Sequence, residues 1–265
     1  MAAPLADPPG LDFHLRWTTL QPPLRPHADV AAAIAGLLPP GAGPGLLLGV
    51  TPELGALPAR IVAADWNAAM VARAWPGDTP SRQALVADWR ALPLGDESMA
   101  AAISDGCFTM LRYPADALRL VEELARVLVP GGRLIARCFT MPEQGETFEE
   151  VRRAADRGTG FHAFKLRLNM AVAWEAGEAT IVCARIFDIF TRLFPDRQAL
   201  SRASGWSLGQ IAEIDAYRDS SSILSYPSRA ELLAVTAERD LSAVFVECGN
   251  YALAERCPLI VLDFP

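Results

Sequence analysis

The stretch GLLLGVTPELG, residues 45–55, contains a short apolar run followed by a turn. The run at 46–50 holds no polar side chain and is bounded by turn residues, which is typical of a central parallel strand buried on both faces. Nucleotide-binding turns after such strands are usually rich in glycine. This one keeps Gly49 but has Thr51 and Glu53 at the next two glycine positions. The stretch predicts the first strand of an α/β sheet with an altered ligand-binding turn.

The residues of the turn predict a helix over 51–57. Thr51 is a favourable N-cap and Pro52 suits the first helical position. Pro52 removes one backbone N–H, and Glu53 places a negative charge where a pyrophosphate would lie. The turn therefore disfavours a dinucleotide and tolerates a ligand with an ammonium or sulfonium charge. An ordinary capped helix in a sheet protein explains the same residues equally well.

Short apolar runs recur along the chain, with helical patterns between most of them. We expect further strands at 60–65, 84–88, 100–104 and 133–139, and helices at 29–38, 67–74 and 115–128. This alternation predicts a doubly wound, mostly parallel sheet of the Rossmann-like kind. Two final apolar segments, 242–247 and 258–264, are predicted to form an antiparallel pair.

The alternation of strands and helices stops after the fifth predicted strand. Residues 142–240 show helical periodicity and no clear strand. Two Ser-x-x-Gln/Glu capping boxes, at 207–210 and 228–231, begin helices there. We expect this insertion to cap the strand ends, where open α/β sheets bind ligands. Its tyrosines, Tyr217 and Tyr226, either contact a substrate or are half-buried structural residues. The expected division of the chain is an N-terminal cap segment at 1–45, a Rossmann-like core at 46–141, a helical cap at 142–240 and C-terminal strands at 241–265.

Composition excludes several classes of function. The formal charge of -7 argues against nucleic acid as the main partner, since phosphate binding needs clustered basic residues. The short basic groups at 152–153 and 165–167 are interpreted as solvated helix faces. No apolar stretch is long enough to span a membrane. Five cysteines without a C-x-x-C pair indicate reduced core residues and a cytoplasmic location. The three histidines lack ligand spacing, so we expect no metal site.

Two aspartates stand at the ends of neighbouring predicted strands. Asp65 ends the second strand and can accept hydrogen bonds from both hydroxyls of a ribose, with Trp66 beside it to cover a purine. Asp88 ends the third strand and can accept the exocyclic amine of adenine, with Trp89 adjacent. For Asp65 alone, capping of the following helix is an alternative. Both strand ends feed one crevice, which favours a shared ligand.

Four segments together resemble the class I S-adenosylmethionine-dependent methyltransferases of the small type 11 sort. They are IVAADWNAAM (61–70), LVADWRALPLGDES (85–98), AAISDGCFTML (101–111) and LVEELARVLVPGGRLIA (120–136). The resemblance covers 45–140 and extends to the last 25 residues. It implies a seven-stranded sheet whose last strand is antiparallel, and S-adenosyl-L-methionine as cofactor.

The resemblance also implies roles for single residues. Gly49 and its neighbour Val50 would pass close to the methionine part of the cofactor, with Ser104 and Asp105 beside the methionine moiety and the methyl acceptor. Asp65 would hold the ribose, and Asp88 with Trp89 would frame the adenine.

The chain departs from the family pattern at the first strand and its turn. Leu47 replaces the usual acidic residue, and Thr51 and Glu53 replace glycines. We hypothesise that Glu53 or the Thr51 hydroxyl partly substitutes for the missing acid.

The predicted function is methyl transfer to a small-molecule acceptor, without nucleic acid or membrane as partner, and a homodimer is left open. A proton acceptor is needed only if the methyl acceptor must lose a proton, and the catalytic residues are left open. Candidates are Asp105, Tyr113, His14, His27 and His162. One alternative is a non-catalytic binding or regulatory protein with a degenerate cofactor turn. A nicotinamide-dependent oxidoreductase is disfavoured by the missing G-x-G-x-x-G motif.

Overall fold

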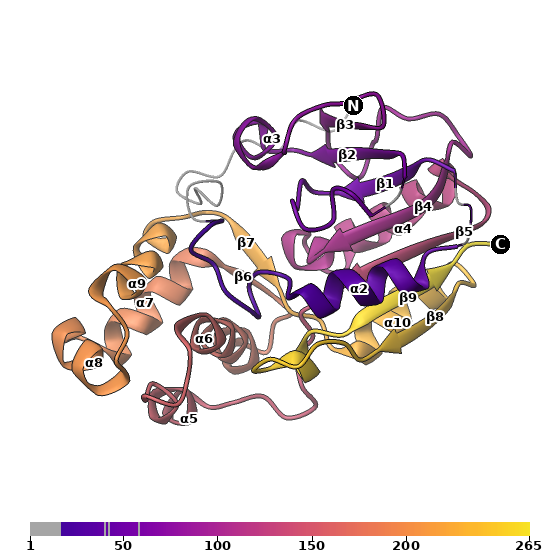
Figure 1. The fold of residues 1–265 in the computed structure, drawn as a ribbon. Coiled ribbons are helices and arrows are strands. Elements are labelled where there is room, and N and C mark those ends of the chain that lie inside the picture. The colour runs from indigo at the N-terminus through magenta and orange to yellow at the C-terminus, as the bar shows by residue number, and fades with distance from the viewer. Residues whose placement is uncertain (1–16, 40, 42, 58) are drawn as a thin grey trace.

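Seven strands form one sheet in the order β3-β2-β1-β4-β5-β9-β8 (Figure 1). The computed structural model describes residues 17–39, 41, 43–57 and 59–265. The strands of this sheet are β1 (Gly45–Leu48), β2 (Ile61–Asp65), β3 (Arg82–Val86), β4 (Met99–Asp105), β5 (Leu128–Arg137), β8 (Ser242–Val246) and β9 (Leu259–Asp263). All seven predicted strands are confirmed, with shifts of a few residues at their ends.

The α-helices are α2 (Ala28–Leu37), α3 (Ala68–Ala74), α4 (Ala115–Val127), α5 (Phe148–Arg153), α6 (Phe161–Ala176), α7 (Cys183–Leu193), α8 (Arg197–Ser204), α9 (Leu208–Ala212) and α10 (Arg229–Ala237). Short 3₁₀ helices are η1 (Cys107–Met110), η2 (Glu213–Tyr217) and η3 (Ala254–Arg256). Both predicted capping boxes are present, at the starts of α9 and α10. Within the described ranges, no helix combines the length and the apolar character that crossing a membrane requires.

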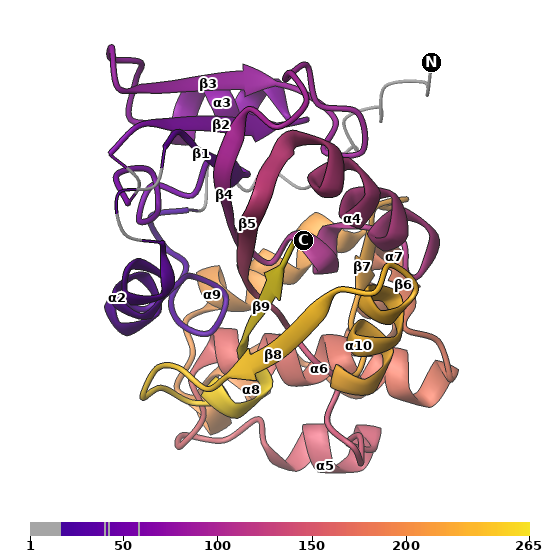
Figure 2. The same cartoon turned by 90° about the vertical axis from the view of Figure 1, so that its right-hand side faces the viewer.

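The central strand β1 is buried along its whole length and explains how the sheet is layered. Leu46 and Leu48 pack in one apolar cluster with α4 and α10. Leu47 points to the opposite face, where it packs in a cluster with α2. Side chains alternate between the faces of a strand, so an all-apolar run is buried only if helices cover both faces. Figure 2 shows α2 on one side of the sheet and α4 and α10 on the other.

The order of the strands in the sheet indicates where along the strand ends a ligand can bind. β1 pairs in parallel with both β2 and β4, and the chain crosses over β1 between β3 and β4. Strand order therefore reverses at the carboxyl ends of β1 and β4, which is where such sheets bind ligands. At the other edge, β9 is antiparallel to β5 and to β8, so the predicted antiparallel pair is confirmed.

The segment after β1 is not the predicted helix. Residues 51–57 form hydrogen-bonded turns, in which the N–H of Leu54 donates to the carbonyl of Thr51 at 3.1 Å. Seven residues that include Gly55 offer too little propensity to nucleate an α-helix. The helix dipole expected at this turn is therefore not present.

The helices α5 to α9 lie together beside the sheet (Figure 1). The prediction that residues 142–240 contain no strand was wrong. β6 (Thr180–Val182) and β7 (Ile223–Ser225) form a small antiparallel pair. Strands of three residues are too short to show a period. The predicted cap boundary at residue 240 also includes α10, whose Leu232 and Val235 pack with α4 against the sheet.

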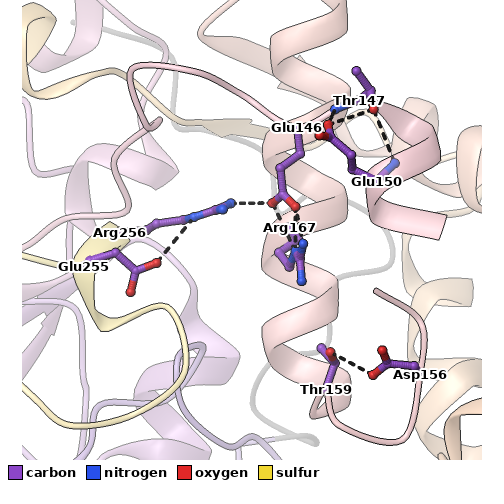
Figure 3. A network of polar contacts seen from close by, with 8 residues as sticks. All are labelled: Glu146, Thr147, Glu150, Asp156, Thr159, Arg167, Glu255 and Arg256. Atoms are coloured by element: carbon purple, nitrogen blue, oxygen red, sulfur yellow. Dashed lines mark hydrogen bonds and ion pairs between the residues drawn. The ribbon is translucent and has the colours of Figure 1, made fainter. Parts of the chain in front are cut away.

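A polar network fixes α6 to the C-terminal part of the chain (Figure 3). Glu146 accepts a hydrogen bond of 2.8 Å from Nε of Arg167 on α6 and one of 2.7 Å from Nη1 of Arg256 on η3. Burial raises the pKa of Glu146, but the two arginines lower it more, so that its pKa lies below the usual value. Nearby, Thr147 and Glu150 form the capping box that begins α5. The position of α6 is thus set by charge as well as by apolar packing.

Candidate functional site

A cavity of about 170 Å³ lies between the carboxyl ends of the central strands and the helical cap. Its sheet side is lined by the residues that follow β1 and by the last residues of β2 and β4. Its cap side is lined by α6, η2 and the end of β7. Seven of the ten predicted cofactor residues line it: Gly49, Val50, Thr51, Asp65, Trp66, Trp89 and Asp105.

Gly49 keeps space open at the sheet side. It has φ +102°, a conformation that favours glycine, and its N–H donates to the carbonyl of Ala64 at 2.7 Å. A Cβ at this position would lie 3.9 Å from Oδ2 of Asp65 and 3.9 Å from Oγ1 of Thr51. The absence of a side chain at Gly49 thus leaves room between a carboxylate and a hydroxyl.

Asp65 is oriented by the start of the next helix. Its Oδ1 accepts a hydrogen bond of 2.8 Å from the N–H of Asn67, and Asn67 in turn caps α3. The sequence-based alternative, in which Asp65 caps that helix, is therefore wrong. Beside it, the rings of Trp66 and Trp89 stack with centroids 5.4 Å apart. Trp89 is fixed by a hydrogen bond of 2.6 Å from Nε1 to the carbonyl of Ala64. A carboxylate and an aromatic wall therefore stand side by side.

Three predicted residues do not line the cavity. The carboxylate of Asp88 is held by Arg90, whose Nη2 lies 2.7 Å from its Oδ2, and the bonds and charge of Arg90 outweigh burial to lower the pKa of Asp88. Ser104 is fully buried and donates from Oγ to the carbonyl of Leu48 at 3.1 Å, which is a sheet contact. Glu53 is paired with Nε of Arg25 at 2.5 Å. In this arrangement neither Glu53 nor Asp88 points its charge at a ligand in the cavity.

The candidate proton acceptors are mostly engaged elsewhere. Tyr113 donates its hydroxyl to a backbone carbonyl of α10 at 3.0 Å, and burial raises its pKa to about 12. His27 accepts a hydrogen bond at the start of α2, and His162 accepts one from the N-terminal segment. His14 lies outside the described residues. Of the remaining candidates, Asp105 lines the cavity, where Nε of the fully buried Arg137 donates to it.

Sequence reasoning missed the polar residues on the cap side. Lys165, interpreted as part of a solvated helix face, is 3% exposed and lines the cavity. Asn169 lies one turn further along α6, and its Nδ2 donates to the hydroxyl oxygen of Tyr226 at 2.9 Å. The sequence analysis did offer Tyr217 and Tyr226 as possible substrate contacts, and both line the cavity. Helical periodicity gave no warning for Lys165, because α6 is buried on most of its surface.

Several polar atoms of the cavity residues have no hydrogen-bond partner within the described part of the chain. They are Nε1 of Trp17, Oγ1 of Thr109 and Oδ1 of Asn169, all buried. Buried polar groups are nearly always hydrogen-bonded, and an unpaired one costs about 1–3 kcal/mol. Three such atoms belong to residues that line one cavity.

Comparison with known proteins agrees with the fold. Residues 38–136 match the family model described as "Methyltransferase domain". The demethylmenaquinone methyltransferase of Mycobacterium sp. (strain KMS) is 33% identical over 162 residues, which cover 59% of this chain and 62% of that protein. The match therefore spans less than two thirds of the length of this relative. A shorter stretch of 68 residues is 37% identical to the Homo sapiens protein named "Probable tRNA methyltransferase 9B", covering 26% of this chain and 15% of that one.

A solved structure shares the whole architecture. The S-adenosylmethionine-dependent methyltransferase from Methanosarcina mazei aligns with a TM-score of 0.50 at 15% identity, over 88% of this chain and 96% of that chain. At this level of identity the alignment shows a common fold. With the family match and the curated relatives, this fold is consistent with a class I S-adenosylmethionine-dependent methyltransferase.

Proposed function

We propose that this protein is an active methyltransferase that methylates a small-molecule acceptor inside the cavity. The observation that carries the proposal is the continuity of the cavity. It joins the carboxyl ends of β1, β2 and β4 to polar side chains of the cap. A cofactor against the sheet would therefore face an acceptor against the cap.

The sheet side fits S-adenosylmethionine. When bound, this cofactor supplies a methyl group on a cationic sulfur, and transfer breaks the carbon–sulfur bond while the electron pair stays on sulfur. Asp65 would accept hydrogen bonds from the ribose, and Trp66 and Trp89 would bound the adenine. Gly49 leaves the space beside Asp65 that the cofactor needs. Thr51 stays a candidate for the methionine part. Glu53, which is paired with Arg25, is not assigned to the methionine part, and Asp88, which is paired with Arg90, is not assigned to the adenine.

The protein's own part in the reaction is to position the acceptor and to exclude water. The cap covers the strand ends, and the cavity lining is largely apolar, as at Leu20, Leu24, Met110, Phe139, Leu166 and Leu224. Asp105 is held by Arg137 and serves best as a fixed part of the wall, so we assign no proton acceptor. The largely apolar lining of the cavity and a formal charge of -7 support a small molecule over an RNA strand.

Thermal unfolding with three ligands tests this proposal. A ligand that binds only the folded state raises the melting temperature. We expect S-adenosylmethionine and S-adenosylhomocysteine to raise it, and NAD to leave it unchanged. A shift with NAD alone would point to an oxidoreductase, and no shift with any ligand would point to the non-catalytic alternative. A short tRNA duplex that competes with S-adenosylhomocysteine would contradict the choice of acceptor.

The division into cap and core segments, a homodimer and a cytoplasmic location stay predictions.

A further inference from the structure

Asn169 is a buried amide in the middle of α6. Its side chain is 1% exposed, and the residues on either side of it, Leu168 and Met170, are apolar and buried. Burying an amide is costly unless its polar atoms are hydrogen-bonded, whereas a leucine of similar size would pack here without that cost. Asn169 therefore needs hydrogen-bond partners to be stable at this position.

The two ends of the Asn169 amide differ in their bonds. Its Nδ2 donates to the hydroxyl oxygen of Tyr226 at 2.9 Å. Its Oδ1 is also buried, and no group within the described ranges of the chain donates to it. Buried acceptors are nearly always hydrogen-bonded, because an unpaired one loses its bonds to water without replacement. The bond to Tyr226 thus uses only part of the capacity of this amide.

Tyr226 directly follows β7 and is held in place by the backbone around it. Its N–H donates to the carbonyl of Ala179 at 2.8 Å, and the hydroxyl of the preceding Ser225 donates to the carbonyl of Leu111 at 2.6 Å. The Tyr226 side chain is 3% exposed. Burial raises the pKa of Tyr226 well above its usual value, so the hydroxyl keeps its proton at neutral pH. Tyr226 is therefore a neutral donor at a fixed position.

The amide of Asn169 and the hydroxyl of Tyr226 together offer one donor and one acceptor. Because the tyrosine oxygen accepts from Nδ2 of Asn169, the tyrosine proton can be donated to a ligand, and Oδ1 of Asn169 can accept. If the amide turns over, Oδ1 accepts the tyrosine proton, while Nδ2 donates to the ligand and the tyrosine oxygen accepts from it. A hydroxyl group matches the pair in both orientations, since one oxygen both donates and accepts.

Both residues line the cavity on its cap side, where Leu166 and Leu224 also belong to the lining. Hydrogen bonds are stronger in apolar surroundings, because little water competes for the same groups. The cofactor residues Gly49 and Asp65 lie on the sheet side of the same cavity. The pair therefore suits a group on the acceptor rather than one on the cofactor.

We propose that Asn169 and Tyr226 form a binding site for a hydroxyl group of the methyl acceptor, which donates to one residue of the pair and accepts from the other. The acceptor is then a largely apolar molecule that carries a neutral hydroxyl. A site of this kind rejects an analogue without the hydroxyl, because the buried polar groups would stay unpaired. This inference rests on the proposed function, which assigns the cap side of the cavity to the acceptor.

A matched pair of probes tests the site by calorimetry in the presence of S-adenosylhomocysteine. 4-Methoxyphenol carries a hydroxyl, and 4-fluoroanisole has nearly the same shape with fluorine in its place. We expect the wild-type protein to bind the phenol about tenfold more tightly, as expected for one or two hydrogen bonds to neutral groups. Equal binding of the two probes, or no binding of the phenol at millimolar concentration, would overturn the hydroxyl site.

A double variant assigns the preference to the pair. Asn169→Leu combined with Tyr226→Phe replaces both partners by apolar groups of similar shape, a change that is nearly neutral for stability. This variant should bind the two probes about equally and bind 4-fluoroanisole at least as well as the wild-type protein does. The control is Tyr113→Phe, since that hydroxyl donates to a backbone carbonyl of α10 outside the cavity lining. It should keep the wild-type preference, and loss of the preference in Tyr113→Phe would contradict the assignment.

The same titrations separate failure of this site from failure of the proposed function. The double variant should bind S-adenosylhomocysteine as the wild-type protein does. A large loss of that affinity, with an unchanged melting temperature, would assign the pair to the cofactor and overturn the acceptor site. Failure of the wild-type protein to bind S-adenosylhomocysteine would contradict the proposed function, while a preference for the phenol would still support the pair as a ligand site.

Selective labelling gives a direct readout that also serves if the double variant does not fold. The sequence has three asparagines, Asn67, Asn169 and Asn250, so ¹⁵N-labelled asparagine gives few side-chain amide signals. Asn67→Asp and Asn250→Ser each remove one of the other signals and thereby identify that of Asn169. It should move more with 4-methoxyphenol than with 4-fluoroanisole, while the exposed Asn250 stays in place. Equal movement with both probes, or equal movement of Asn250, would contradict the site.

Discussion

Arg137 is fully buried, and its Nε donates a hydrogen bond to the carboxylate of Asp105 at the cavity wall. Its Nη1 donates to the backbone carbonyl of Pro23 at 2.8 Å, which fixes the N-terminal segment beside the cavity. Burial lowers the pKa of this guanidinium, but Asp105 raises it more, so that the group stays charged. One buried ion pair thus holds together the end of β4, the end of β5 and the segment that covers the site.

Removal of the negative charge from this pair should destabilise the protein. Asp105→Asn leaves the guanidinium of Arg137 buried without its counterion, and breaking a buried pair in this way costs about 3–5 kcal/mol. Urea unfolding followed by circular dichroism measures the change. Asp96→Asn is the matched control, since Asp96 pairs with Arg126 but is 76% exposed, and it should cost less than about 1 kcal/mol. Equal effects of the two substitutions would contradict the importance assigned to burial.

The two strand-end aspartates should differ in their effect on the cofactor. Asp65→Asn should weaken S-adenosylhomocysteine binding by about tenfold or more, because a charge-assisted hydrogen bond to the ribose is lost. Asp88→Asn should change the affinity little, since Arg90 already holds that carboxylate away from the cavity. Calorimetry on both variants decides between them. A larger loss in Asp88→Asn would mean that Asp88 leaves Arg90 when the ligand binds.

Gly49→Ala should impair both stability and cofactor binding. A residue with a side chain at φ +102° is strained by about 1–3 kcal/mol, and the new methyl group would occupy space beside Asp65 and Thr51. Gly36→Ala is the control, because Gly36 lies in α2 with open space around it and should gain about 0.5–1 kcal/mol. Thermal unfolding with and without S-adenosylhomocysteine separates the two effects. An unchanged ligand-induced shift in Gly49→Ala would show that the cofactor does not use this space.

The stability conferred by Glu146 should depend on pH. Its pKa is lowered in the folded protein, so its contribution is fully present above the unfolded value of about 4.3 and is lost as the pH falls through the lower folded value. At pH 7, Glu146→Gln should reduce the free energy of unfolding by about 1–3 kcal/mol, since the hydrogen bonds to Arg167 and Arg256 lose their negative partner. The difference from wild type should shrink as the pH falls below about 4.

Urea unfolding of wild type and Glu146→Gln at pH 7 and at a pH below about 4 measures this difference. Glu149→Gln serves as its control, because Glu149 is an exposed partner of Arg152 and should contribute much less at either pH. A difference between Glu146→Gln and wild type that grows towards low pH would contradict the assigned direction of the pKa change.

The sequence was informative where burial follows a local period. The apolar run at β1 predicted a strand covered on both faces, and the alternation of strands and helices predicted the sheet. It failed at 51–57, where favourable capping residues did not suffice to form a helix, and at β6 and β7, which are too short to show a pattern. The pairing of Asp88 with Arg90 was visible as a D-x-R spacing, but the spacing alone does not tell an ion pair from a ligand contact.

The sequence by itself determined the order along the chain of the main strands and helices, and it placed two aspartates at strand ends. Apolar runs and the turn residues that bound them are local properties of the chain. Only the tertiary structure decided which of these side chains share a cavity. Lys165 and Asp65 are 100 residues apart in the sequence, yet both line that cavity. Their shared position depends on how α6 packs over the sheet, and Glu146 and the cap core fix that packing through contacts between distant segments.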